Sequence, residues 1–206
     1  MNEWKELFNG KNLDGWEDVK NADHWSVENG MIVCVCGSAP AMSNLSTKEK
    51  YRDFELVLEY NADANTNSGV FVRVSDLEDE VNTGLEIQIL GTYDTARSLN
   101  SADCGALYDL VAPKVNSAHS AGKWNDLRIA CRGPIIEVDL NGARTVDANL
   151  DDFDTPGKNP DGEKNKFLYA WKTMPRVGHI GLQSHSGMGN LSGVKIRFRN
   201  IRLREL

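Results

Sequence analysis

Residues 84–91 read Gly-Leu-Glu-Ile-Gln-Ile-Leu-Gly, an alternation of apolar and polar side chains. A period of two is typical of a β-strand whose two faces have different surroundings. The leucine and isoleucines at 85, 87 and 89 suit a hydrophobic core. Glu86 and Gln88 point the other way, about 7 Å apart on a strand that rises roughly 3.3 Å per residue. This second face is therefore expected either on open solvent or in a polar cleft.

Two further stretches repeat this arrangement and supply more polar side chains. In residues 69–73 (Gly-Val-Phe-Val-Arg), the valines share one face, and Phe71 and Arg73 share the other. In the later stretch Ile-Gly-Leu-Gln-Ser-His, Gln183 and His185 share the polar face. If the three strands are neighbours in one sheet, their polar side chains gather on one surface. This shared polar surface is the predicted functional site.

Asparagine–glycine pairs and one break in the strand pattern mark where the chain turns. Asn29-Gly30 and Asn141-Gly142 each stand between strand-like runs, as in tight β-hairpin turns. Near the end of the chain, the apolar phase slips by one residue between Phe198 and Ile201. That slip predicts a β-bulge at Arg199-Asn200, because a bulge adds one residue to one strand of a pair.

The remaining segments also favour an all-β architecture. Residues 37–50 are small and polar and are predicted as a loop, and residues 151–166 are rich in Gly, Pro and Asp, as surface loops are. Residues 92–122 form a long irregular connection, which in a compact domain is usually functional or disordered. No stretch is convincingly helical over three turns. We therefore predict a single domain over residues 1–206, an antiparallel β-sandwich or barrel.

Composition narrows the class of protein. The 206 residues are 40% hydrophobic, which suits one substantial core. Thirty acidic against 23 basic side chains give a formal charge of −7, which argues against nucleic acid as a partner. No apolar run approaches the roughly 18 residues of a membrane span, and the four cysteines lack the spacing of a zinc site. Because no signal peptide opens the sequence, the expected location is cytoplasmic, or extracellular if a signal has been removed.

Eight stretches, taken together and in order, resemble a known family across nearly the whole chain. They are Leu7–Trp16, Trp25–Gly30, Asn67–Arg73, Leu85–Ile89, Gly105–Asp109, Gly122–Asn125, Gly178–His185 and Phe198–Leu203. They resemble the 3-keto-disaccharide hydrolase family, long called a domain of unknown function. The resemblance implies a concanavalin A-like jelly roll of two antiparallel sheets, one of them concave and sugar-binding. It also implies a carbohydrate partner, a glycoside oxidised at C3 of its sugar ring.

A ketone at C3 changes the chemistry that the site must perform. It acidifies the proton on C2, so the glycosidic bond can break by β-elimination if a base, an enolate-stabilising group and an acid are present. Glu86 and His185 are the candidate bases or acids, and Arg73 is the candidate for the enolate oxygen. Alternatively, a divalent metal ion held by Glu86 and His185 polarises the ketone. No other cofactor is indicated. Conventional glycosidases use two carboxylates, whereas the strand neighbour of Glu86 is an amide, Gln88.

Seven further side chains are candidates for binding substrate: Gln88, Gln183, Asn67, Phe71, Tyr108, Lys114 and Trp124. Tyr108 and Lys114 belong to the long irregular connection and are expected at the rim. Each candidate also has a structural interpretation: Glu86 as a solvated carboxylate, Arg73 as a salt-bridge partner, the aromatic side chains as core. The rival function is a non-catalytic carbohydrate-binding module, which does not require Glu86, Arg73 and His185 to converge in one pocket.

Overall fold

The computed structural model describes residues 3–19, 24–36, 43–91, 97–185, 188 and 192–206. The larger of its two sheets contains β1 (Lys5–Glu6), β3 (Trp25–Glu28), β4 (Met31–Val35), β6 (Phe54–Ala62), β9 (Trp124–Arg132), β10 (Ile135–Leu140), β11 (Ala143–Asn149) and β13 (Lys195–Glu205). The smaller contains β2 (Trp16–Glu17), β5 (Ser43–Thr47), β7 (Asn67–Val74), β8 (Leu85–Leu90) and β12 (His179–Ser184). The connections carry α1 (Glu80–Thr83), η2 (Leu150–Asp152) and η3 (Trp171–Thr173). Among the described residues, no helix is long and apolar enough to cross a membrane.

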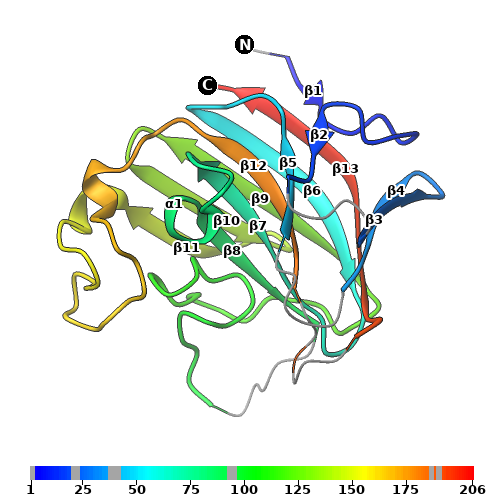
Figure 1. The fold of residues 1–206 in the computed structure, drawn as a ribbon. Helices are drawn as coiled ribbons and strands as arrows, with labels where there is room; N and C mark the ends of the chain where they lie inside the picture. Colours follow the sequence, from blue (N-terminus) through cyan, green and yellow to red (C-terminus); the bar gives the residue numbers. More distant parts are fainter. Residues whose placement is uncertain (1–2, 20–23, 37–42, 92–96, 186–187, 189–191) are drawn as a thin grey trace.

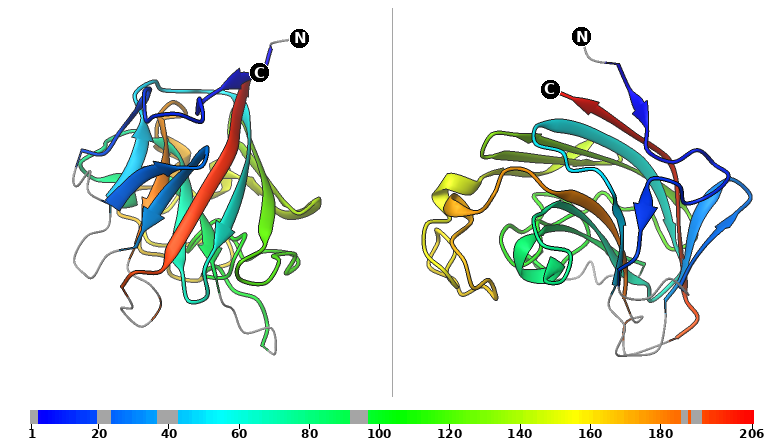
Figure 2. Two further views of the ribbon diagram at one scale, coloured as in Figure 1. Left: turned by 90° about the vertical axis from the view of Figure 1, so that its right-hand side faces the viewer. Right: turned by 45° about the horizontal axis from the view of Figure 1, so that its top comes forward.

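The two sheets pack face to face as a sandwich (Figures 1 and 2). The strand order is β11-β10-β9-β6-β13-β4-β3 in the larger sheet, where β1 also pairs with β13, and β2-β5-β12-β7-β8 in the smaller. Every pair of neighbouring strands is antiparallel. The predicted fold class is therefore confirmed. Because β12, β7 and β8 are consecutive neighbours, the three stretches with polar faces lie side by side.

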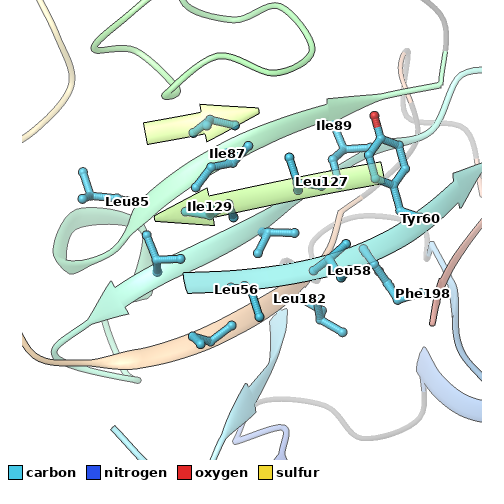
Figure 3. Packing of buried hydrophobic residues seen from close by; sticks show 14 of the residues in the cluster. Leu56, Leu58, Tyr60, Leu85, Ile87, Ile89, Leu127, Ile129, Leu182 and Phe198 are labelled. Carbon is cyan, nitrogen blue, oxygen red and sulfur yellow. The ribbon is translucent and has the colours of Figure 1, made fainter. Parts of the chain in front are cut away.

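Apolar side chains from both sheets meet in the space between them. On β8, the leucine and isoleucines at 85, 87 and 89 are all fully buried, which confirms the period-two pattern. Figure 3 shows them in the same cluster as Leu127 and Ile129 of β9. Val70 and Val72 of β7 and Leu182 of β12 belong to the same core. The opposite face of these three strands is thereby turned away from the core.

Turns and the bulge occur where the sequence predicts them. Asn29-Gly30 joins β3 to β4 with φ values of 51° and 76°, and Asn141-Gly142 joins β10 to β11 with φ values of 50° and 79°. Two successive positive φ values are what the tightest hairpin turns require. The register of β13 against β6 shifts between Arg199 and Arg202, and Asn200 has a φ of 53°. The predicted β-bulge is confirmed.

Part of the predicted loop at 37–50 is a strand instead. Residues 37–42 lie outside the described residues, but residues 43–47 form β5, between β2 and β12. The segment reads Ser-Asn-Leu-Ser-Thr, and its one large apolar residue, Leu45, is buried. One apolar residue is too weak a pattern to indicate a strand. Pairing with two neighbouring strands overrides the low local propensity.

The irregular connection covers the edge of the smaller sheet. Residues 92–96 lie outside the described residues, but the later part of the connection runs along β8. The amide of Tyr108 donates to the carbonyl of Glu86 at 2.8 Å. The amide of Gly105 donates to the carbonyl of Gln88 at 2.8 Å, and the amide of Gln88 donates to Ala106 at 3.1 Å. Because an open strand edge would leave such groups unpaired, this segment completes β8 and fixes Tyr108 beside Glu86.

Candidate active site

A small pocket lies on the polar face of the smaller sheet, away from the core. Its volume is about 100 Å³, well below the roughly 300–1,000 Å³ of sites for drug-sized ligands. It therefore suits a group no larger than one sugar ring. Eight residues line it: Asn67, Val81, Glu86, Gln88, Tyr108, Lys166, Gln183 and His185. Six of the ten predicted site residues are among them.

Glu86 is a buried carboxyl group with a strongly shifted pKa. Its side chain is only 7% exposed, and burial raises its pKa from an ordinary 4.5 to about 7. Desolvation has this effect because a low-dielectric surrounding disfavours the charged form. The positive charge of Lys166 and a hydrogen bond with Gln183 partly oppose the rise. A carboxyl group that titrates near neutral pH is suited to general acid or base catalysis.

Gly69 on β7 makes room for this carboxyl group. A Cβ atom at position 69 would lie 2.8 Å from Glu86 Oε1 and 2.9 Å from Glu86 Cγ. We expect Gly69→Ala to fold but to lower kcat by about 10²-fold, because misplacing a reacting group by about 1 Å can cost that much. Far-UV circular dichroism and steady-state kinetics on the substrate proposed below measure the two effects. Wild-type kcat in the folded variant would contradict this role.

A chain of two amides and one imidazole fixes the ring of His185. Gln88 Nε2 donates to Asn67 Oδ1 at 2.9 Å. The other end of the Asn67 amide, Nδ2, lies 3.3 Å from His185 Nδ1. Since an amide NH₂ group only donates, Nδ1 accepts, and the neutral ring carries its proton on Nε2. His185 is therefore arranged as an N–H donor on the side of the ring away from Asn67.

Two amide oxygens of the pocket accept no hydrogen bond within the described part of the chain. Gln88 Oε1 and Gln183 Oε1 are both buried and accept no hydrogen bond from the described residues. Buried polar atoms are normally satisfied, because an unmade hydrogen bond is costly. Both oxygens can therefore accept a hydrogen bond from donors on a bound molecule. The hydroxyl groups of a sugar ring are such donors.

Lys166 and Val81 are the lining residues that the sequence analysis missed. The backbone amide of Lys166 donates to Asp109 Oδ2 at 2.6 Å, and its Nζ lies 4.3 Å from the centroid of the Tyr108 ring. Although part of the side chain is exposed, desolvation lowers the pKa of Lys166, and the carboxylates of Glu86 and Asp109 oppose this change. Nothing in the polar loop around Lys166 distinguishes it from other surface lysines. Only the tertiary fold brings it to the pocket.

The prediction that Arg73 joins this surface is wrong. Its side chain is 1% exposed, and its guanidinium donates to the carbonyls of Gly133 at 2.7 Å and Arg52 at 3.2 Å. It also forms an ion pair with Asp53 at 3.3 Å. The cause is a bulge: Arg73 has a φ of 57°, and the register of β7 against β12 shifts beside it. The strict alternation therefore ends before Arg73, which is a salt-bridge partner within the fold.

Three predicted substrate-binding residues also lie outside the pocket. The ammonium group of Lys114 is 4.0 Å from Asp147 on β11, in the larger sheet. The guanidinium of Arg199 lies 3.8 Å from the ring centroid of Trp124, also in the larger sheet. Phe71 is 1% exposed, too buried for a sugar to stack on its ring. The side-chain types suit a sugar site, but their positions in the fold do not.

A larger groove, of about 520 Å³, lies on the larger sheet and includes Glu59, Arg128 and Asp139. Two of the three acidic groups among its lining residues are paired with arginines: Glu59 with Arg199 at 2.7 Å and Asp139 with Arg128 at 2.6 Å. Despite some desolvation, these partners lower the pKa of both carboxyl groups. Carboxylates held in the charged form by arginines are poor proton acceptors. The smaller pocket is therefore the better candidate for an active site.

Comparison with known proteins identifies the family of the chain. A profile of the 3-keto-alpha-glucoside-1,2-lyase-like domain matches residues 3–204. The chain belongs to this family. The resemblance carried by eight short stretches is thereby confirmed over nearly the whole sequence.

Two relatives align with the chain at close to full length. The 3-keto-disaccharide hydrolase of Bacteroides thetaiotaomicron is 22% identical, over 97% of this chain and 77% of the relative. A crystal structure from Parabacteroides distasonis, provisionally described as a glycosyl hydrolase, is 32% identical and covers 100% of both chains. Its TM-score of 0.84 shows that this protein has the sandwich fold described above.

Two more distant structures have the same fold. The β-glucanase of Bacillus licheniformis is 13% identical, with a TM-score of 0.60 over 100% of this chain and 98% of that one. The carbohydrate-binding module CBM66 of Bacillus subtilis is 12% identical, with a TM-score of 0.54 over 93% and 96%. At such identities the likeness concerns the fold alone. The predicted jelly roll is confirmed, and the fold is compatible with both catalysis and binding.

The pocket offers two metal-ligating side chains of the predicted kind, Glu86 and His185. No group of three or more His, Cys, Asp and Glu side chains suited to a metal ion occurs in the part of the chain that the structure describes. A catalytic zinc site uses three protein ligands, and here the Lys166 ammonium interacts with the Glu86 carboxylate. The described residues of the pocket therefore do not make up a three-ligand metal site.

Proposed function

We propose that this protein cleaves 3-keto glycosides by removing the proton on C2 of the oxidised sugar. The observation that carries the proposal is Glu86, a buried carboxyl group with a pKa of about 7, beside the cationic Lys166 in a pocket sized for one ring. Membership of the keto-glucoside family supports the choice of substrate. The relative from Bacteroides thetaiotaomicron, named a 3-keto-disaccharide hydrolase, supports it too.

The first step forms an enolate. Glu86 takes the C2 proton, and the C–H electron pair moves to form a C2–C3 double bond while the carbonyl electrons move to O3. Lys166 stabilises the negative charge on O3, the role that the sequence analysis gave to Arg73. A cation that lines the pocket stabilises a developing oxyanion by direct electrostatic attraction.

The second step releases the leaving group. The enolate electrons re-form the ketone, the C1–O1 bond breaks, and a C1–C2 double bond remains. His185 donates a hydrogen bond from Nε2–H to the departing O1, since Asn67 holds its Nδ1 as an acceptor. Glu86 then delivers the proton that it took from C2 to this oxygen and becomes a carboxylate again. Addition of water across the C1–C2 bond would complete a hydrolysis; without it, the reaction ends as an elimination. Both outcomes use the same residues.

A conventional glycosidase mechanism fits the pocket less well. Retaining and inverting enzymes place two carboxyl groups across the glycosidic bond. Glu86 is the single carboxyl group among the described residues that line this pocket. The other strand-borne polar groups, Gln88 and Gln183, are amides, which bind hydroxyl groups but do not exchange protons at neutral pH.

Matched substrates test the proposal. The protein should cleave a 3-keto-glucoside and leave the parent glucoside intact, because without the ketone the C2 proton is too weakly acidic for Glu86 to remove. Deuterium at C2 should slow the reaction if proton removal limits the rate. Cleavage of both substrates would indicate a conventional glycosidase. Sugar binding without cleavage of either would favour the carbohydrate-binding module, which the unpartnered oxygens of Gln88 and Gln183 would equally serve.

Replacing Lys166 tests the electrostatic part of the mechanism. Lys166→Met should lower kcat by about 10²–10³-fold, as loss of one group that stabilises an oxyanion does. It should also move the acidic limb of the pH–rate profile to higher pH, because the Lys166 charge lowers the pKa of Glu86. The exposed Lys164 in the same loop gives a matched control, Lys164→Met. An unshifted acidic limb in Lys166→Met would show that the cation does not act on Glu86.

A further inference from the structure

The pocket holds too little of a glycoside to account for its whole substrate. At about 100 Å³ it takes the oxidised ring, so the leaving group must lie outside, on the rim. We infer that this rim is a binding site for an apolar leaving group, such as an aromatic or alkyl alcohol, in preference to a second sugar. The inference rests on the proposed function and adds the chemical class of the leaving group.

Two exposed apolar side chains follow the pocket-lining Lys166 by two and three residues in the sequence. Leu168 is 64% exposed and Tyr169 is 48% exposed. An extended chain spans at most about 3.6 Å per residue. The Cα atoms of Leu168 and Tyr169 therefore lie within about 7 Å and about 11 Å of the Cα atom of Lys166, a pocket-lining residue. A leaving group that projects from the pocket past Lys166 comes within reach of both side chains.

The backbone beneath these two side chains is held in place. On the N-terminal side, the amide of Lys166 donates to Asp109 Oδ2 at 2.6 Å. The ring of Phe167 is buried and packs edge-on against Trp171, with centroids 5.0 Å apart. Leu168 and Tyr169 therefore lie between two residues that are held in place, Lys166 and Trp171. A pre-formed apolar surface binds a ligand without the entropic cost of ordering a loop.

A third exposed apolar side chain belongs to a different connection near the pocket. Met188, three residues after the pocket-lining His185, is 40% exposed. Its amide donates to the carbonyl of Asn65 at 2.7 Å, two residues before Asn67, which also lines the pocket. Apolar side chains therefore flank the pocket on two connections that are far apart in the sequence. Methionine is common at surfaces that accept varied apolar ligands.

The distribution of exposed apolar residues supports this assignment. Eight large hydrophobic side chains are exposed among the described residues: Trp4, Val19, Val35, Val115, Leu168, Tyr169, Met188 and Leu206. Three of the eight lie within three positions of a pocket-lining residue. A second sugar would bring hydroxyl groups that Leu168 and Met188 cannot hydrogen-bond, whereas an apolar leaving group would bury both side chains and itself.

Two 3-keto-glucosides with alcohol leaving groups separate these cases: a benzyl 3-keto-glucoside and a 3-keto disaccharide. We expect kcat/KM to be about tenfold higher for the benzyl compound, the effect of removing roughly 50–60 Å² of apolar surface from water. The double variant Leu168→Ser/Tyr169→Ser should remove that advantage mainly through KM. It should change the disaccharide kinetics less than about twofold. The control Val115→Ser, at another exposed apolar residue, should leave the kinetics of both substrates unchanged.

Other outcomes overturn the inference in distinct ways. Preference for the disaccharide, with loss of that preference in the double variant, would make Tyr169 a platform for a second sugar. An equal loss for both substrates would give the two residues a structural role. If the wild type cleaves neither compound, the proposed function fails. Equilibrium binding of the same two compounds then tests the apolar site by itself. Tighter binding of the benzyl compound that the double variant abolishes would support the apolar site, and equal binding of the two compounds would contradict it.

Discussion

Glu86→Gln is expected to lower kcat on a 3-keto glycoside by about 10²–10⁴-fold, the usual contribution of a positioned general base. Glutamine keeps the shape and the hydrogen bonding of the side chain but cannot accept the C2 proton. Steady-state kinetics measure the loss, and the exposed Glu163, in the same connection as Lys166, provides the control Glu163→Gln. A variant Glu86→Gln with wild-type kcat would transfer the role of base to another group.

The pH dependence of the wild type follows from the same residue. A base must be deprotonated, and the pKa of Glu86 is about 7 in the folded protein. We therefore expect kcat/KM to fall about tenfold per pH unit below that value and to level off above it. The residual activity of Glu86→Gln should lack this limb. A limb near pH 4.5 would mean that the carboxyl group is solvated during catalysis.

The same substitution should increase stability at alkaline pH. The folded-state pKa of about 7 lies above the ordinary 4.5, so the folded state binds the Glu86 proton more tightly than the unfolded state does. Between these two pKa values, stability falls as pH rises, by a total of about 2–4 kcal/mol. Glutamine avoids this loss. Urea unfolding should show Glu86→Gln more stable than the wild type at pH 8 and nearly equal at pH 4; an equal effect at both would exclude titration of Glu86 as the cause.

Much of the fold could be predicted because its signals are local. The period-two pattern of β8 depends only on which residues face the core, and the Asn-Gly turns depend only on two residues that tolerate positive φ. The pocket members Glu86, Gln88, Gln183 and His185 follow from the same pattern once β8, β7 and β12 are neighbours. Side chains alternate between the two faces of a regular strand. A sequence that indicates the strand therefore also indicates which side chains share a face.

The rest of the site depends on contacts between distant parts of the chain. Arg73 leaves the predicted surface because one residue with a positive φ redirects it toward Asp53 and Gly133. Lys166 reaches the pocket because Asp109 holds its backbone from another connection. Neither the direction of Arg73 nor the position of Lys166 produces a periodic pattern in the sequence. The cation of the proposed mechanism comes from a loop rather than from a strand.

Ile87→Asp is expected to prevent folding, although Ile87 is the direct neighbour of Glu86. Its side chain is fully buried between the sheets, near β9 (Figure 3). Losing a buried isoleucine costs about 2–5 kcal/mol, and burying an unpartnered polar group adds about 1–3 kcal/mol. The sum approaches the about 5–15 kcal/mol by which a domain is stable. Circular dichroism and urea unfolding should show no cooperative transition, whereas the control Ile87→Val should lose only about 1 kcal/mol. A cooperative transition of Ile87→Asp at the wild-type midpoint would contradict the burial of this face and with it the side assigned to Glu86.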